Sequence, residues 1–292
     1  MKKSALIFLL SAAGVLRAET LSVQITSQSG EPTAAFLVSA DKDGIFISTA
    51  ANGGNSYKLP MANIREITVQ EPTGWSAAMQ AYGAGQYDAA EGMFARIADE
   101  HVKIVPMQDG YGSLARLYQF LCMKALGKLE VLGAAMDKQL ANPLSLGPLY
   151  LEEFVDLEGW SLLGKKDWQS LGVFLKKFED GNPLNLPQAP FKRVRTARLA
   201  ELCYLRANLN EHGEKKPDMA LLDYHRALTL DLGSNPALLR MAAVAALRLT
   251  DEKVQSTPGD EKLVKQAKSL ALVCRDLGGK GALPADYEKY LK

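Results

Sequence analysis

Residues 85–98 read GQYDAAEGMFARIA, and their spacing of small and aromatic residues is the strongest indication of the fold. Gly85 is followed two residues later by Tyr87, and Ala90 stands three residues after the tyrosine. Phe94 comes four residues after Ala90. Side chains three and four residues apart lie on one face of an α-helix. The spacing therefore predicts a tight turn followed by a helix whose small residue, Ala90, lets a neighbouring helix pack closely.

This pattern resembles the second half of a tetratricopeptide (TPR) repeat. The family has a glycine in the turn, then tyrosine, alanine, an aromatic residue and a small or apolar residue, and these places are filled here by Gly85, Tyr87, Ala90, Phe94 and Ile97. The resemblance implies a binding or scaffolding protein. It also implies an α-solenoid, because one helix pair cannot bury its apolar stripe alone and stacked pairs leave a groove where partners dock.

Weaker copies of the pattern follow, giving a solenoid of about five helix pairs. The expected pairs are 73–84 with 86–102, 113–126 with 129–140, 149–163 with 168–178, 195–210 with 218–230, and 237–249 with 262–277. The fourth pair has Ala220, Tyr224 and Ala227 at the family's spacing, whereas Leu132 and Leu171 replace alanine in the second and third. Residues 250–260 are expected to form a polar loop, and residues 284–291 a capping helix.

Residues 21–69 have the pattern of strands and turns rather than of helices. Short apolar runs predict five strands, near residues 21–25, 35–38, 45–47, 57–59 and 64–69. Asp41-Lys-Asp43-Gly44 predicts a hairpin turn, because Asp-Gly tolerates a positive φ. The set resembles a small SH3-like or Sm-like barrel, and a β-hairpin cap on the helical domain is the alternative. So small a module buries little core alone, so we expect it to rest on the first helices.

The N-terminal residues 1–18 predict a secretory signal peptide. Lys2 and Lys3 form a positive start, an apolar run covers residues 5–16, and Ala18 ends a plausible cleavage site. The run is shorter than the roughly 20 residues of a spanning helix, which makes a retained anchor the weaker alternative. No later stretch predicts a membrane span. We expect a periplasmic or secreted bacterial protein with a β-module at 19–71 and a TPR-like helical domain at 72–292.

Charge and cysteine content bear on the class of partner. The chain has 34 basic and 33 acidic residues, and loss of the signal peptide removes three basic residues and no acidic one. Such a balance argues against nucleic acid as the main partner. Cys122, Cys203 and Cys274 fall in apolar helical stretches and are expected to be buried, with one disulfide between neighbouring repeats as the alternative. No metal-ligand spacing is present, and no cofactor is expected.

The sequence contains no recognisable catalytic motif. The three histidines, His101, His212 and His225, belong to no catalytic or metal-binding pattern, and no nucleophile elbow or phosphate-binding glycine motif is found. We therefore predict that the protein is not an enzyme. A hydrolase with a dispersed site ranks third among the functional hypotheses.

A basic cluster is the candidate partner-binding site. Lys192, Arg195 and Arg198 are three residues apart, so on a helix they share a face that can present donors to a carboxylate, an anionic glycan or a lipid headgroup. A solvated basic rim at a helix start is the alternative. Some TPR proteins hold a terminal carboxylate with Lys and Asn on successive first helices, but Trp75 and Met79 occupy the matching places here.

The leading functional hypothesis is a protein–protein interaction or assembly scaffold of the bacterial cell envelope. Its expected partner is another envelope protein or a peptide in the solenoid groove, and a homo-oligomer is also compatible with the sequence. The alternative is a carbohydrate-binding or peptidoglycan-binding protein that uses the β-module as its contact surface.

Overall fold

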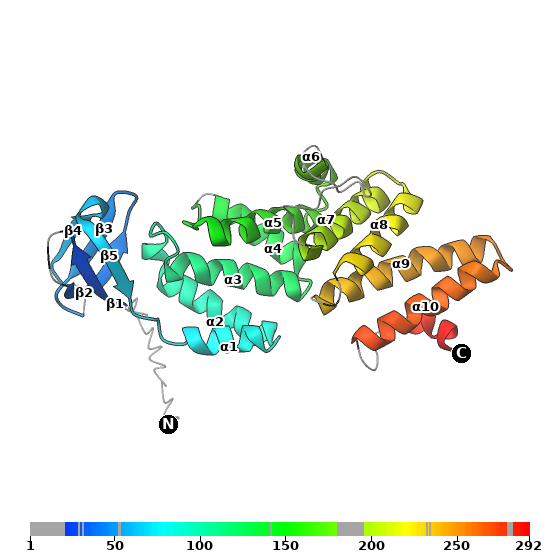
Figure 1. Ribbon diagram of the computed structural model, residues 1–292, viewed down its shortest axis with the longest axis horizontal. Helices are drawn as coiled ribbons and strands as arrows, with labels where there is room; N and C mark the ends of the chain where they lie inside the picture. The colour runs from blue at the N-terminus through cyan, green and yellow to red at the C-terminus, as the bar shows by residue number, and fades with distance from the viewer. Residues whose placement is uncertain are drawn as a thin grey trace, which may run out of the picture. The chain divides into compact units, whose positions relative to one another are not determined.

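The computed structural model describes residues 21–28, 30, 32–51, 54–140, 142–179, 196–231, 233, 235–278 and 283–292 (Figure 1). The predicted signal peptide lies outside these residues. Contacts divide the chain into two compact units: unit 1 comprises Met1–Gln119 and Leu144–Gly147, and unit 2 comprises Phe120–Pro143 and Pro148–Lys292. The fold is mainly helical and is preceded by a β-sheet.

Unit 1 begins with the five predicted strands. They are β1 (Leu21–Ser27), β2 (Pro32–Ala40), β3 (Gly44–Ser48), β4 (Ser56–Pro60) and β5 (Ile64–Val69). They form one antiparallel sheet in the order β4-β3-β2-β1-β5, and the short 3-10 helix η1 (Met61–Asn63) precedes β5. Within the described residues no ladder joins β4 to β5, so the structure shows a five-stranded sheet and barrel closure stays a prediction.

The sheet builds its core from alternate residues of its strands. Leu21, Val23 and Ile25 of β1 are buried together with apolar residues of β2 and β3. Ile104, in the 3-10 helix η2 (Val102–Ile104), belongs to the same core, and Tyr111 packs against it. The small sheet therefore completes its core with residues from the helical part of unit 1, as expected from its size.

The turn between β2 and β3 lies where the sequence predicted it, but its glycine has another role. Asp41 Oδ1 accepts hydrogen bonds from the backbone N–H groups of Asp43 and Gly44, both at 2.9 Å. Gly44 does not have a positive φ. Instead, a Cβ at Gly44 would lie 2.6 Å from the carbonyl oxygen of Leu59. The positive-φ explanation was wrong: the close approach of β4 requires the glycine.

The other elements of the described chain are helices. They are α1 (Trp75–Gly83), α2 (Tyr87–Glu100), α3 (Tyr111–Ala125), α4 (Leu129–Leu140), α5 (Pro148–Gly164), α6 (Trp168–Glu179), α7 (Thr196–Asn208), the π-helix η3 (Leu209–Gly213), α8 (Pro217–Leu230), α9 (Pro236–Ser256), α10 (Glu261–Gly278) and the 3-10 helix η4 (Ala285–Leu291). Within unit 2, α4 packs on α5, α5 on α6, α7 on α8, α8 on α9 and α9 on α10. Three of these contacts, α5 with α6, α7 with α8 and α9 with α10, join the two helices of a predicted pair. The solenoid stays a prediction.

The last helix pair differs from the expectation. Residues 250–256 continue α9 and do not belong to a loop. Their polar groups are satisfied inside the fold: the buried Thr250 hydroxyl donates to the Ala246 carbonyl at 2.8 Å, and Asp251 accepts a 2.6 Å hydrogen bond from the Tyr290 hydroxyl. Tyr290 belongs to the 3-10 helix η4, which lies where a capping helix was expected. The polar composition of residues 250–256 predicted a loop. The prediction was wrong because the tertiary partner of Asp251 is distant in sequence and could not be recognised.

One backbone conformation recurs in the turn of each described helix pair. A left-handed residue stands two positions before the second helix of the pair, and in chain order these residues are Gly85 (φ 73°), Gly127 (φ 69°), Lys166 (φ 56°), Lys215 (φ 58°) and Gly259 (φ 98°). In the first three turns, the N–H of the next residue bonds the carbonyl five residues earlier, at 2.9 to 3.0 Å. The five turns therefore share one backbone conformation, although two of them lack glycine.

The three cysteines are buried and free. Burial raises the pKa values of the Cys203 and Cys274 thiols to about 11. The expectation that the cysteines serve as small buried apolar residues is confirmed, and the structure does not contain the alternative disulfide.

Ala90 provides a test of the helix register predicted from the spacing of Tyr87, Ala90 and Phe94. Ala90, Phe94 and Ile97 are all fully buried, at 0% exposure. Replacing Ala90 with leucine is expected to lower the free energy of unfolding by about 1–3 kcal/mol, because the contact has no room for a larger side chain. The matched control is Ala89→Leu, on the exposed face of the same helix. Urea denaturation that finds both variants equally stable would show that the register is wrong.

Candidate binding groove

A groove in unit 2 opens along the turns of three successive helix pairs. It has a volume of about 780 Å³ and involves the α3–α4 turn, the α5–α6 turn, and the segment from α7 to the residues before α8. The lining residues are Gly127, Lys128, Leu129, Glu130, Val131, Leu163, Gly164, Lys166, Trp168, Tyr204, Asn208, His212 and Lys215. The recurring turn thus places residues from distant parts of the sequence at one site.

A second hollow of about 430 Å³ extends the groove onto α9. It shares Tyr204, Asn208 and His212 with the first hollow, and these residues are four apart, so they lie on one side of α7 and its π-helical continuation. The remaining lining residues are Tyr224 of α8 and Arg240, Met241, Val244, Ala245 and Arg248 of α9. Because three residues line both hollows, we treat them as one groove, called the unit 2 groove below.

Aromatic rings form part of the groove wall. Tyr204 stacks on Trp160, with ring centroids 5.4 Å apart and an interplanar angle of 21°, and burial raises the pKa of its hydroxyl. At the other side of the first hollow, the rings of Trp168 and His212 lie 5.7 Å apart in a tilted arrangement. Tyr204 is buried whereas His212 is exposed. The wall therefore contains both a buried and an accessible aromatic ring.

The π-helix η3 fixes the wall between the two hollows. Its residue Glu211 is nearly buried, pairs with Arg248 of α9, and accepts a 2.9 Å hydrogen bond from the Tyr224 hydroxyl. Burial opposes the charge of Arg248, but Glu211 outweighs this effect and the pKa of the guanidinium is raised. Burial, followed by Glu211, likewise raises the pKa of Tyr224. One carboxylate therefore joins η3, α8 and α9 beside the groove, and π-helices often occur at functional sites.

A buried ionic network supports η3 from behind. Asp223 of α8 is fully buried and accepts hydrogen bonds from Arg206 Nε at 2.8 Å and Arg206 Nη2 at 2.7 Å. Arg226 Nη1 donates at 2.8 Å, and Asn210 Nδ2 of η3 donates at 3.1 Å. Four donors on one carboxylate satisfy a charge that has no access to water. The network fixes α7, η3 and α8 to one another.

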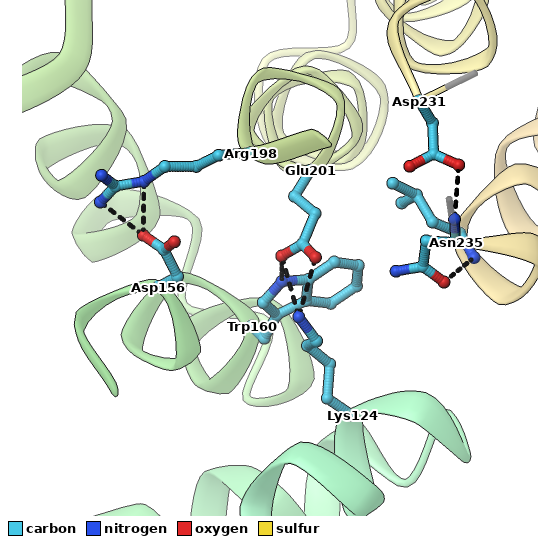
Figure 2. Close-up of polar contacts among 8 residues, drawn as sticks. Lys124, Asp156, Trp160, Arg198, Glu201, Asp231 and Asn235 are labelled. Atoms are coloured by element: carbon cyan, nitrogen blue, oxygen red, sulfur yellow. Dashed lines mark hydrogen bonds and ion pairs between the residues drawn. The ribbon is translucent and has the colours of Figure 1, made fainter. Parts of the chain in front are cut away.

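A second polar network links α3, α5 and α7, the first helices of three successive pairs (Figure 2). Glu201 of α7 accepts from Lys124 Nζ at 2.8 and 3.0 Å and from Trp160 Nε1 at 2.9 Å. Lys124 Nζ also lies 5.5 Å from the centroid of the Trp160 ring. Figure 2 also shows Asn235, whose side chain accepts from the Leu238 N–H at 3.1 Å and caps α9 where the sequence predicted a helix start.

Of the predicted basic cluster, the structure describes Arg198, whereas Lys192 and Arg195 lie outside the described residues. Arg198 Nε and Nη2 donate to Asp156 Oδ1 at 3.0 and 2.7 Å, and its side chain is 13% exposed (Figure 2). It also pairs with Glu152 of α5. Burial raises the pKa of Asp156 to about 6, against the opposing effect of Arg198. Arg198 thus joins α5 to α7, and the role of the three-residue cluster in partner binding stays a prediction.

The unit 2 groove was not predicted from the sequence. Its residues come from separate helix pairs, and no single motif contains them. One local signal was available, because Lys166 and Lys215 occupy the turn position that glycine fills at Gly85 and Gly127.

His225 provides a pH test within unit 2. It is partly buried, its Nε2 lies 2.8 Å from Gln266 Nε2 of α10, and burial lowers its pKa from the ordinary value near 6.5. The unfolded chain therefore takes up this proton first, so stability is expected to fall as the pH drops below 6.5. His225→Gln cannot take up the proton. Urea denaturation from pH 7.5 to pH 5 should show a steeper loss for the wild type than for the variant, and parallel curves would contradict the assignment.

The groove lining combines basic, aromatic, polar and apolar side chains. Within the described residues, no group of three or more His, Cys, Asp or Glu side chains is placed to hold a metal ion, and no helix combines the length and apolarity needed to cross a membrane. No family model, curated protein or solved structure matches this chain. The resemblance to the TPR family therefore rests on the sequence pattern and stays a prediction.

Proposed function

We propose that the protein is a non-enzymatic interaction or assembly scaffold of the bacterial cell envelope, and that the unit 2 groove binds an extended segment of another envelope protein. The observation that carries this proposal is the course of the groove, which passes through the turns of three successive helix pairs and reaches α9. The proposed envelope location rests on the predicted signal peptide.

The chemistry of the groove favours binding over catalysis. Glu211, in the π-helix that continues the groove-lining side of α7, is occupied by Arg248 and Tyr224. A general base needs a carboxylate or imidazole that reaches the substrate, and these contacts hold Glu211 within the wall. Most of the accessible lining groups are cationic, aromatic or apolar, beside one exposed carboxylate, Glu130, and one exposed imidazole, His212. This is a suitable combination for recognising a polypeptide.

Filling the groove tests the proposal. Ala245 lines the second hollow and is partly exposed, so Ala245→Trp is expected to obstruct it without entering the core. The matched control is Ala89→Trp, at an exposed position in unit 1. We expect wild type and control to recover the same partner from an envelope extract, and Ala245→Trp to lose it while melting at the same temperature as the wild type. Equal recovery by all three proteins would refute the proposal.

A further inference from the structure

We infer that the unit 2 groove binds an acidic peptide segment, and that Lys166 and Lys215 recognise its carboxylates. This inference rests on the proposed function and adds to it the chemical class of the occupant and the residues that select it.

Lys166 and Lys215 have a backbone conformation that is unusual for lysine. Glycine fills the left-handed turn position in three of the five described helix pairs, where it has no Cβ to clash with the following carbonyl. Lys166 and Lys215 adopt the same conformation at φ 56° and 58°, which strains a residue with a long side chain. Asp109 is the one other non-glycine residue of the described chain with a positive φ, and aspartate tolerates this region better.

The two strained lysines occur at one site. Both line the unit 2 groove, where the third turn has a glycine, Gly127, whereas the glycine turns at Gly85 and Gly259 are not among the lining residues. Backbone strain that a glycine would relieve is found most often where the side chain is needed for function. Here the two strained residues are lysines, and they place two primary ammonium groups at one groove.

The lining residues of the groove have an excess of positive charge. The two hollows together contain five basic residues, Lys128, Lys166, Lys215, Arg240 and Arg248, and one acidic residue, Glu130. Arg248 is held by Glu211 and Glu252, but Lys215 and Arg240 make no ion pair with any residue that the structure describes. The Lys166–Glu130 pair is 4.0 Å long and highly exposed, so it is weak. In a chain of nearly balanced charge, this local excess attracts and orients a negatively charged partner.

The apolar lining residues define the rest of the occupant. Val131 is 53% exposed at the first hollow, and Met241 and Val244 are partly exposed at the second. An extended peptide places successive side chains on opposite sides. A segment with acidic residues interspersed with apolar ones can therefore contact the lysines and the apolar wall together.

Peptide binding to the full chain tests the inference. The probe is the fluorescein-labelled octapeptide Gly-Glu-Leu-Asp-Ser-Leu-Glu-Gly, compared by fluorescence anisotropy with its Gln and Asn counterpart at low and high salt. At low salt we expect the wild type to bind the acidic probe about tenfold more tightly than the counterpart, because the counterpart lacks the three side-chain carboxylates. Lys166→Gly/Lys215→Gly is expected to lose this preference. No preference in the wild type, or a preference that persists in the variant, would overturn the inference.

A thermal melt of the same variant separates recognition from folding. Glycine relieves the left-handed strain at both turns, so the melting temperature of Lys166→Gly/Lys215→Gly should equal or exceed that of the wild type. A lower melting temperature would mean that the lysines support the turns, which contradicts the inference.

Two further variants complete the design. Lys166→Gln/Lys215→Gln keeps long side chains and should also lose the preference for the acidic probe, whereas Lys262→Gln/Lys268→Gln changes the same charge at exposed positions of α10 and should retain it. The reverse pattern would overturn the assignment to the two groove lysines. If Ala245→Trp abolishes partner recovery while the wild type shows no acidic preference, the proposed function stands and this inference fails. If Ala245→Trp recovers the partner normally, the proposed function itself fails.

Discussion

Replacing Arg206 with methionine is expected to lower the free energy of unfolding by about 3–5 kcal/mol. Arg206 supplies two of the four hydrogen bonds that Asp223 accepts, and Asp223 is fully buried. Removal of the guanidinium leaves a buried carboxylate short of donors and of opposite charge. Urea denaturation at neutral pH measures the loss. A loss below about 1 kcal/mol would contradict a buried network at this position.

Two companion variants show whether the loss comes from the unpaired charge. Arg226→Met removes a donor whose side chain is 21% exposed, so it should destabilise the protein less than Arg206→Met. The double variant Arg206→Met/Asp223→Leu removes both buried charges and should recover part of the stability lost in Arg206→Met, because an apolar pair can replace a buried ion pair. Additive losses in the double variant would show that the two residues do not interact.

Changing Gly164 to alanine is expected to destabilise the protein by about 3 kcal/mol. A Cβ at Gly164 would lie 2.0 Å from the carbonyl oxygen of Leu129 and 2.4 Å from its carbonyl carbon. The obstructing atoms are backbone, so the end of α5 must move away from the start of α4. Both residues line the unit 2 groove, so the change should also weaken partner binding.

Gly172→Ala in α6 is the matched control for this prediction. The nearest atom to a Cβ at Gly172 is Leu209 Cδ2 at 3.7 Å, an ordinary contact. Alanine should therefore raise stability by about 0.5–1 kcal/mol through its higher helix propensity. The two glycine substitutions thus have opposite expected signs in a thermal or urea melt, and the same sign for both would contradict the packing described at Gly164.

Much of the secondary structure could be predicted from the sequence because local periodicity determines it. The strand alternation at residues 21–25 and the spacing from Gly85 to Phe94 both led to the observed elements. Periodicity failed at residues 250–256, where polar side chains find buried partners in η4 and keep α9 intact. Gly44 shows a similar limit, because its requirement comes from the neighbouring strand and not from its own turn.

The groove could not be predicted because its chemistry depends on long-range placement. Arg206 and Asp223 look like ordinary surface charges on two helices until the fold buries them against each other. Arg198 looked like part of an exposed basic face, but carboxylates of α5 occupy it. The lysines at the glycine positions of two turns were visible in the sequence, yet their significance depends on the groove that the turns share.

Photocrosslinking from the groove shows whether a partner binds there. A benzophenone amino acid placed at Val131 lies in the groove lining, whereas the same group at Val173, which is 62% exposed on α6, lies outside it. Irradiation in the native envelope, followed by mass spectrometry, identifies what each position contacts. We expect a discrete partner adduct from Val131, with the crosslink in an acidic segment of that partner, and no such adduct from Val173. Adducts of equal yield from both positions, or none from Val131, would contradict the proposed binding site.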